Sequence, residues 1–186
     1  MRTTMLTTLI LAGALCVVGA GCRSSSNPPE ATPTMKQEQR DTGEILKVGD
    51  AAPDFQATDH LGEQHSLADY RGKKNVVLIF YPMNETPGCT KQLCSARDDW
   101  SKYEERGVQV FGVNPGTVES HRKFAENHGF PFPLLADTGK DLVRDYGAEG
   151  LLATKRTVYA IDKEGRIVFA ERGLPSTDAI LAGIPQ

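Results

Sequence analysis

The sequence is poor in several residue types that mark particular classes of protein. Its 186 residues include four cysteines and one tryptophan, aromatic residues make up 7%, and the formal net charge is −3. Because there is no basic surplus, the chain lacks the electrostatic footprint of a nucleic-acid-binding domain, and we predict no nucleic-acid partner. No internal repeat is visible, which excludes a solenoid. A chain of this length holds one globular domain and leaves little room for a second.

Long hydrophobic runs are also lacking, apart from one near the N-terminus. Residues 5–20 are uncharged and mostly apolar, and they lie between a basic start and two small residues that precede Cys22. This pattern indicates a secretory signal, because the run is too short for a typical membrane-spanning helix. The small residues before Cys22 also resemble a bacterial lipoprotein signal, although Gly19 stands where such signals usually carry a branched apolar residue. We predict a signal peptide at residues 1–21 and a lipid at Cys22, with an ordinary cleaved signal or a retained anchor as alternatives.

The segment after the signal has almost nothing to bury. Residues 22–45 are mostly serine, proline, threonine and charged residues, which predicts a flexible tether. The folded domain is then expected at residues 46–186. We expect the protein to be exported and anchored to a membrane through its lipid, or else to be soluble in the periplasm or secreted.

Only two cysteines, Cys89 and Cys94, lie in the expected domain, because the other two belong to the export segment. Two thiols close in sequence, in a compartment where disulfides persist, indicate either a redox pair or a structural disulfide.

Strand-like and helix-like segments alternate along the domain. Residues 75–81 and 108–113 are continuous apolar runs, which predict strands buried on both faces. Apolar side chains recur at helical spacing within residues 87–105, which predicts one amphipathic helix. The other expected elements are two short strands within 54–70, strands at 132–136, 157–161 and 167–170, and helices at 117–128, 139–146 and from about residue 176. This order predicts an α/β sandwich of the thioredoxin type, with a central mixed β-sheet flanked by helices.

Cys89 falls at the third position of the helix that directly follows the first buried strand. Thr86 fits the N-cap of that helix, and Pro87 fits its first position. Helix N-termini present unpaired backbone N–H groups and a partial positive charge. A thiolate is stabilised there, so Cys89 is expected to be a reactive nucleophile.

Cys94 lies five residues beyond Cys89 on the same predicted helix. In an intact helix the two Cα atoms would be roughly 8.5 Å apart, whereas a disulfide requires them within about 7 Å. A bond between Cys89 and Cys94 therefore requires the start of the helix to unwind. The spacing also differs from the C-x2-C of thioredoxin-like dithiols.

The stretch from Tyr81 to Thr90, YPMNETPGCT, resembles the peroxiredoxin active-site loop, Pro-x-x-x-Thr-x-x-Cys. With Cys94 five residues after Cys89, it is similar to the bacterioferritin-comigratory, or Q-type, subfamily, which belongs to the thioredoxin-like superfamily. The resemblance extends over residues 46–186 and includes the stretches VGDAAPDF at 48–55, VESHRKF at 118–124, FPLLAD at 132–137 and RTVYAID at 156–162.

This resemblance implies a thiol-dependent peroxidase, an atypical 2-Cys peroxiredoxin that reduces hydrogen peroxide and organic hydroperoxides without a metal or organic cofactor. Cys89 would attack the peroxide, and Cys94 would resolve the resulting sulfenic acid as an intramolecular disulfide. Pro82 would shield the thiolate, Thr86 would hydrogen-bond the peroxide, and Arg156 would lie near the sulfur. For an exported protein, the expected reductant is an extracytoplasmic thioredoxin-like dithiol.

Other interpretations of the cysteine pair remain open: a structural disulfide, a thiol–disulfide exchanger acting on proteins, or a non-catalytic metal-binding module on the same fold. The histidines do not favour a metal site. His121 and His128 are about 10.5 Å apart along a helix, and helical metal pairs favour a spacing of four residues. His60 and His65 lie near an early turn, where we expect them to be solvated.

Overall fold

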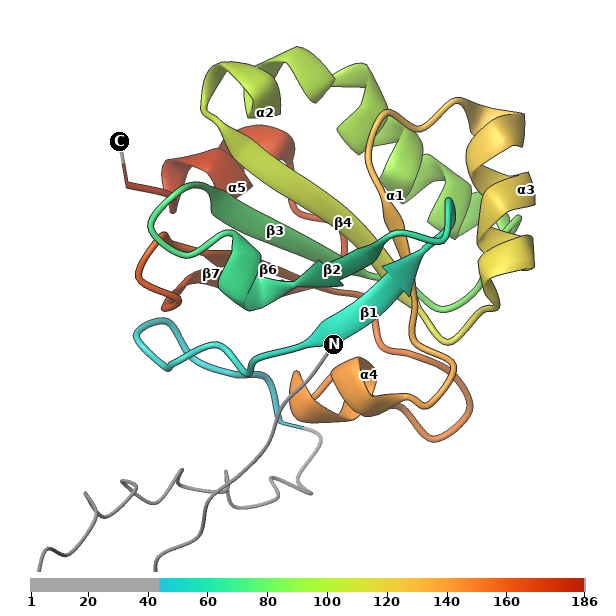
Figure 1. Ribbon diagram of the computed structural model, residues 1–186, viewed down its shortest axis with the longest axis horizontal. Coiled ribbons are helices and arrows are strands. Elements are labelled where there is room, and N and C mark those ends of the chain that lie inside the picture. Colours follow the sequence, from blue (N-terminus) through green and yellow to red (C-terminus); the bar gives the residue numbers. More distant parts are fainter. Residues whose placement is uncertain (1–43, 186) are drawn as a thin grey trace, which may run out of the picture. The chain divides into compact units, whose positions relative to one another are not determined.

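The computed structural model describes residues 44–185, so the predicted signal and all but the end of the predicted tether lie outside the described residues. Figure 1 shows strands and helices alternating along the chain. The strands are β1 (Gln56–Asp59), β2 (Gln64–Ser66), β3 (Asn75–Phe80), β4 (Val108–Asn114), β5 (Leu134–Ala136), β6 (Thr157–Ile161) and β7 (Ile167–Arg172). The helices are α1 (Pro87–Asp98), α2 (Trp100–Glu105), α3 (Val118–His128), α4 (Asp141–Asp145) and α5 (Thr177–Ala182), with a short 3-10 helix η1 at Leu67–Asp69.

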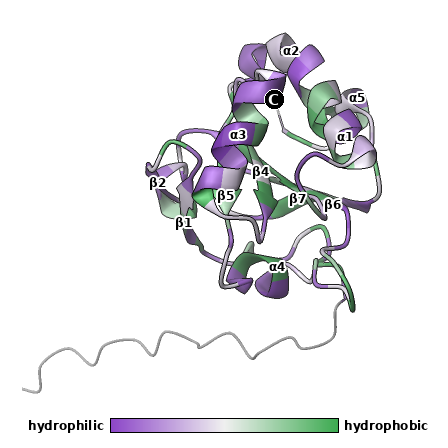
Figure 2. Cartoon of the chain, turned by 90° about the vertical axis from the view of Figure 1, so that its right-hand side faces the viewer, coloured by the Kyte–Doolittle hydropathy of each residue, from purple (hydrophilic) through white to green (hydrophobic). Residues whose placement is uncertain are grey.

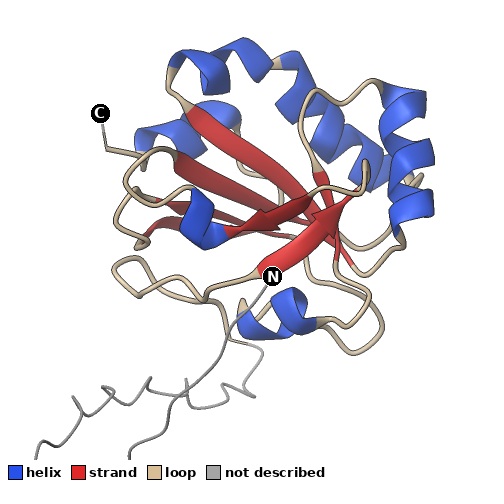
Figure 3. Ribbon diagram, in the orientation of Figure 1, coloured by secondary structure: helices blue, strands red, loops and turns tan. Residues whose placement is uncertain are grey.

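The strands form one mixed sheet in the order β2-β1-β5-β4-β3-β6-β7. β4 pairs in parallel with β3 and β5, whereas β6 runs antiparallel to both β3 and β7. Figure 3 shows this sheet between helices, as the alternation of segments predicts. The expected α/β thioredoxin-like architecture is therefore confirmed.

β3 lies inside the sheet, and all of its residues are buried. Val77 and Ile79 pack in the core beneath α1, α2, α3 and α5. Leu78 and Phe80 point to the opposite face, where they pack with α4, η1 and the N-terminal part of the domain. This two-sided burial explains why the strand is a continuous apolar run rather than an alternating one. In Figure 2 the hydrophilic colour lies largely on the helices, outside these cores.

The helix predicted at residues 87–105 is in fact two helices, because the chain turns at Asp99. The backbone of Asp99 leaves helical geometry (φ −94°, ψ 16°). Its carboxylate accepts hydrogen bonds from Thr177 and from Lys102, whose Nζ lies 3.1 Å away. An aspartate that finds such partners competes with the helical backbone. Because Thr177 lies far along the chain, the apolar periodicity of residues 87–105 does not reveal this break.

Two other elements begin later than predicted. β5 starts at Leu134 because Pro133 has no N–H for the sheet. α4 starts at Asp141 because Lys140 is left-handed (φ 58°). None of the helices within residues 44–185 is long and apolar enough to cross a membrane.

Candidate active site

Cys89 lies in the first turn of α1, just beyond the carboxyl end of β3. It is a free thiol, fully buried, and the third residue of the helix, with Pro87 at the first position. The unpaired N–H groups of the first turn and the helix dipole favour a negative charge on its sulfur. The predicted placement of Cys89 is therefore confirmed.

Arg156 reaches this sulfur from a segment 67 residues further along the chain. It precedes β6, the strand antiparallel to β3, and its Nη2 donates a hydrogen bond to Cys89 Sγ at 3.1 Å. Gly88 makes the approach possible, because a Cβ at that position would lie 2.7 Å from Arg156 Nη2. The site thus combines a helix N-terminus with a permanent cation, and both stabilise a thiolate.

Gln92 is a site residue that the sequence reasoning missed. Its Oε1 accepts a hydrogen bond from Arg156 Nη1 at 2.8 Å, so the guanidinium bridges Gln92 and Cys89. The side chain is buried, and its Nε2 has no protein partner. The available signal was its position three residues after Cys89, which places both side chains on one helical face.

Thr86 occupies the N-cap position of α1, as predicted, but its hydroxyl does not cap the helix. The Oγ1 atom instead donates a weak hydrogen bond to the carbonyl oxygen of Met83 at 3.4 Å. The Thr86 hydroxyl thus points back to another residue of the loop between β3 and α1. A bond this long is readily exchanged for a better acceptor.

Pro82 starts the same loop and is half-buried. It lies, with Met83, on a cleft of about 450 Å³ at the carboxyl ends of β3 and β4, between this loop and α4. The loop residues named from the sequence, Pro82 and Thr86, thus belong to the same short segment that leads into Cys89.

A hydrogen-bond network, buried at His121 and Asn114 and exposed at Ser120, holds this loop against β4 and α3. Asn84 Oδ1 accepts bonds from the Tyr81 hydroxyl at 2.9 Å and from Asn114 Nδ2 at 2.8 Å. Asn84 Nδ2 donates to Ser120 Oγ at 2.8 Å, and His121 Nε2 donates to Asn114 Oδ1 at 2.9 Å. Sequence reasoning missed these residues, although Asn114 carried a signal, since it is a polar residue that directly ends a buried strand.

The adjoining residue, Glu85, forms a second link to α3. It has a left-handed backbone (φ 57°), and its carboxylate accepts bonds from Asn127 Nδ2 at 2.8 Å and His128 Nε2 at 3.0 Å. These two hydrogen bonds hold the pKa of Glu85 below its usual value. The loop is therefore fixed on both sides of Asn84 before α1 begins.

Two buried rings beside the loop have shifted pKa values. Burial lowers the pKa of His121 to about 4, so the ring is neutral near pH 7. With Nε2 donating to Asn114, its Nδ1 is an acceptor that has no protein partner. Burial, together with the charge of Cys89, raises the pKa of Tyr81 well above its usual value.

Cys94 is not brought close to Cys89. Both are free thiols on the uninterrupted helix α1, where a separation of five residues corresponds to about 8.5 Å between Cα atoms. Cys94 is partly buried against the core beneath α1. The structure therefore represents the reduced arrangement. Cys22, the predicted lipidation site, lies outside the described residues.

His60 is not solvated, contrary to expectation. Its side chain is buried, and its Nδ1 accepts a hydrogen bond from the backbone N–H of Leu134 at 3.1 Å, which links the β1–β2 turn to β5. Burial lowers the pKa of His60.

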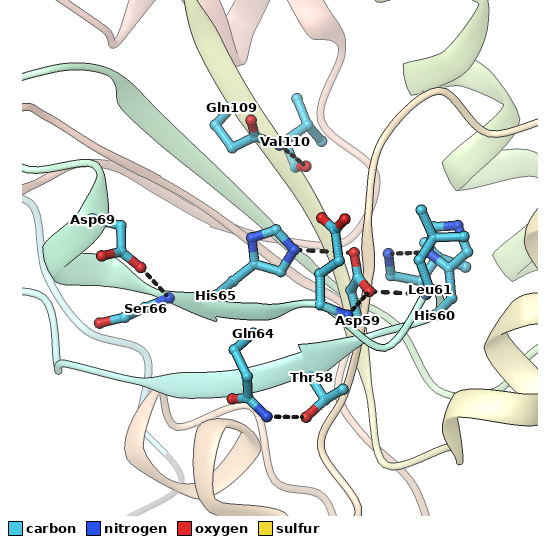
Figure 4. Close-up of polar contacts among 12 residues, drawn as sticks. Thr58, Asp59, His60, Leu61, Gln64, His65, Ser66, Asp69, Gln109 and Val110 are labelled. Atoms are coloured by element: carbon cyan, nitrogen blue, oxygen red, sulfur yellow. Dashed lines mark hydrogen bonds and ion pairs between the residues drawn. The ribbon is translucent and has the colours of Figure 1, made fainter.

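His65 is also partnered, as Figure 4 shows. Its Nε2 donates to Asp59 Oδ2 at 3.0 Å, and its Nδ1 accepts from the Tyr70 hydroxyl at 2.9 Å. Potential metal-ligating atoms of Asp59, Glu63 and His65 lie within 4.8 Å of one another. However, Asp59 Oδ1 also accepts from the backbone of Leu61 and Glu63. These bonds satisfy the carboxylate within the turn, so the cluster is explained as support for the β1–β2 hairpin.

Comparison with known protein families matches residues 48–170 to the family described as AhpC/TSA. The chain belongs to this family. Its similarity to Peroxiredoxin Q, chloroplastic, of Triticum aestivum places it in the peroxiredoxin Q, or bacterioferritin-comigratory, subfamily: the two are 35% identical over 156 residues, which cover 80% of this chain and 71% of the relative. This peroxiredoxin is accordingly a thiol-dependent peroxidase, as its loop motif predicts.

Solved structures agree with this assignment. Peroxidoxin BcpB from Mycobacterium tuberculosis superimposes with a TM-score of 0.70 at 32% identity, over 74% of this peroxiredoxin and 96% of the other chain. The Xanthomonas campestris Bacterioferritin Comigratory Protein, whose structures concern alkyl peroxide reduction, gives a TM-score of 0.65 at 26% identity, over 72% and 96% of the two chains.

Proposed function

We propose that this peroxiredoxin is an atypical 2-Cys enzyme in which Cys89 is oxidised by the peroxide and Cys94 resolves the product. The Cys89 thiolate attacks one peroxide oxygen, the O–O bond breaks, and the second oxygen leaves with a proton as water or an alcohol. The Cys94 thiolate then attacks the sulfur of the Cys89 sulfenic acid, and hydroxide leaves, taking a proton to form water. An external dithiol reduces the disulfide and is itself oxidised.

The observation that carries this proposal is the 3.1 Å hydrogen bond from Arg156 Nη2 to Cys89 Sγ at the start of α1. A cation in this position favours the thiolate form of cysteine, which is the form that attacks a peroxide. During the attack, negative charge moves onto the leaving oxygen. Arg156, the Thr86 hydroxyl and the backbone N–H groups of the first turn are the donors available to stabilise it. Pro82, at the start of the loop, limits the access of water to the thiolate.

Resolution by Cys94 requires α1 to open. A disulfide needs Cα atoms within about 7 Å, which an intact helix does not provide for residues five apart. We infer that the first turns of α1 unwind after the sulfenic acid forms and carry Cys89 out of its buried site. The links of Asn84 and Glu85 to α3 would remain and confine the movement to the segment after them.

For the substrate, we propose organic hydroperoxides together with hydrogen peroxide. Two features support this. The Xanthomonas campestris relative is described in terms of alkyl peroxide reduction. In this chain, the loop that leads to Cys89 adjoins a cleft large enough for an organic group.

We further propose that the protein is exported and anchored by a lipid on Cys22. The apolar run and the small residues before Cys22 support this. An extracytoplasmic thioredoxin-like dithiol would then be the reductant, because a cytoplasmic donor could not reach the enzyme. Mass determination of the N-terminal peptide from membranes tests the anchor. A diacylated Cys22 is expected, and a free N-terminus beginning elsewhere would contradict it.

The catalytic proposal is tested by peroxide consumption with dithiothreitol as reductant, in wild type, Cys89→Ser and Cys94→Ser proteins. Cys89→Ser should abolish turnover. Cys94→Ser should retain it with dithiothreitol, which reduces a sulfenic acid directly, but should lose it with a thioredoxin-type protein. One equivalent of peroxide should give a Cys89–Cys94 disulfide in wild type by peptide mapping. Wild-type turnover equal to that of Cys89→Ser would contradict the mechanism, and metal retention and disulfide exchange on proteins would then be measured.

A further inference from the structure

Two adjacent leucines in the loop between α4 and β6 are almost fully exposed. The side chains of Leu151 and Leu152 are 99% and 96% accessible. Single exposed apolar residues are common, but consecutive large ones with nearly all of their surface in water mark an interaction site. Both leucines line the cleft beside the β3–α1 loop, and Met83, which is 60% exposed, lines the same cleft. We call Met83, Leu151 and Leu152 the leucine rim.

The loop that carries the two leucines begins beside the point where the N-terminal segment enters the domain. A Cβ at Gly147 would collide with the backbone carbonyl of Glu44. Two residues after Glu44, the backbone N–H of Leu46 donates a hydrogen bond to the Tyr159 hydroxyl at 3.2 Å. The Tyr159 hydroxyl in turn donates to the backbone carbonyl oxygen of Tyr146 at 2.6 Å. The entry point of the N-terminal segment is therefore fixed against the end of α4 and the base of this loop.

We propose that the leucine rim docks on a lipid bilayer. This inference rests on the proposed lipid anchor at Cys22. Between Cys22 and Glu44 the chain advances 44 − 22 = 22 residues, and a flexible tether of that length, as the composition predicts, would have a root-mean-square reach of about 25 Å. An anchor with this reach keeps the entry point, and with it the adjoining loop, at a high effective concentration near the bilayer. A contact too weak to bind membranes alone then suffices to orient the domain.

Docking of the rim has a consequence for the reaction. The rim borders the cleft that begins at Pro82, the first residue of the loop leading to Cys89. With Leu151 and Leu152 in the bilayer surface, the mouth of this cleft faces the lipid. Hydroperoxides formed on membrane lipids would then meet the active-site loop without first entering the water.

The test replaces the natural anchor, so that it does not depend on lipidation. The chain from residue 23, which contains both hydrophobic cores, carries an N-terminal histidine tag. It is held on vesicles of phosphatidylcholine and phosphatidylglycerol that contain a nickel-chelating lipid. The Leu151→Ser/Leu152→Ser protein is compared with Leu61→Ser, a matched control on the β1–β2 turn that is 64% exposed.

The first readout is a ratio of rates: reduction of phosphatidylcholine hydroperoxide in the vesicles over reduction of tert-butyl hydroperoxide in water. Removing two leucines from the interface should lower this ratio about tenfold or more. The ratio for Leu61→Ser should equal that of wild type. An unchanged ratio in the double variant, or an equal fall in Leu61→Ser, overturns the proposal.

The second readout needs no enzymatic activity. An environment-sensitive fluorophore at Leu151→Cys, in a Cys89→Ser/Cys94→Ser background, should shift its emission to shorter wavelength on attachment to the vesicles. The same fluorophore at Leu61→Cys should not shift. Emission typical of water at both positions, with vesicles present, overturns docking. A dimer in analytical ultracentrifugation that depends on the leucine rim also overturns it, because the rim would then bind a second copy of the chain. If neither the wild type nor any variant reduces tert-butyl hydroperoxide, the catalytic proposal fails instead. The emission of the fluorophore then still decides whether the rim docks.

Discussion

Gly88 and Arg156 are so close that a side chain at position 88 would push the guanidinium out of its present position. A Cβ at Gly88 would lie 2.7 Å from Arg156 Nη2, the atom that donates to Cys89 Sγ. The glycine is thus part of the site although it contributes no side chain. Its role is to permit the close approach of the cation.

A first prediction concerns this approach. Gly88→Ala should displace Arg156 from Cys89 and lower the second-order rate constant for peroxide by about tenfold or more, the value of one charge-assisted hydrogen bond. Folding should be little affected, because alanine is favourable in a helix. Stopped-flow oxidation of the protein measures the rate. Ser95→Ala, an exposed change on the same helix, should react like wild type, and an unaltered rate in Gly88→Ala would contradict the assignment.

A second prediction separates the charge of Arg156 from its shape. Arg156→Lys keeps the positive charge but lacks the planar pair of nitrogens through which the guanidinium bonds Gln92 and Cys89. We expect the rate with peroxide to fall by about tenfold to a hundredfold, and Arg156→Ala to lose more. Alkylation by iodoacetamide also needs the thiolate, but it has no leaving oxygen that a hydrogen-bond donor could stabilise. The rate of alkylation should therefore fall less in Arg156→Lys than the rate with peroxide. Equal loss in the two reactions would place the role of Arg156 wholly in ionising the thiol.

A third prediction concerns stability against pH. Burial lowers the pKa of His121 to about 4, so the unfolded state binds more protons than the folded state between that value and the usual 6.5. The free energy of unfolding should therefore decrease as the pH falls, by about 2 kcal/mol between about pH 7 and about pH 5 from this residue. Urea denaturation at the two pH values measures it.

The control for this pH effect is matched on the same helix. His121→Gln should reduce the pH dependence, whereas Lys123→Gln, an exposed change on the same helix, should leave it nearly intact. Some dependence of the same sign should persist in both variants, because burial also lowers the pKa of His60. If His121→Gln retained the full wild-type slope, the neutral state of the buried ring would be in doubt.

A fourth prediction concerns oxidation. After one equivalent of peroxide, the amides of residues 90–94, which are hydrogen-bonded within α1, should lose protection in hydrogen exchange, because the disulfide cannot form on an intact helix. Amides of α3 should keep theirs. Cys94→Ser, oxidised under the same conditions, should retain the protection of α1. Persistence of that protection in the disulfide form of wild type would contradict unwinding.

The sequence predicted the sheet, the position of Cys89 and the loop motif, because each depends on local order: a fully apolar strand, a proline at the helix start, a cysteine two residues later. The contacts that complete the site join distant segments. Arg156 was named only from the family resemblance, and nothing local predicts its hydrogen bond to Cys89. Gln92 and the link between Asn84 and Asn114 were missed for the same reason. The break at Asp99 depends on Thr177, 78 residues away in the chain (177 − 99), and was predicted as continuous helix.

The break at Asp99 would also limit the structural change that the proposed resolution by Cys94 requires. Helix formation is cooperative along a helix, so unwinding that starts at Cys89 tends to spread toward the C-terminal end. In this protein it meets a boundary after twelve residues. Beyond it, α2 is fastened to α5 by Lys102 and Asp178 at 2.9 Å and by Tyr103 and Thr177 at 3.4 Å. In the proposed mechanism, only the segment before this break would open, while α2 and α5 would keep their contacts with each other and their place in the core above the sheet.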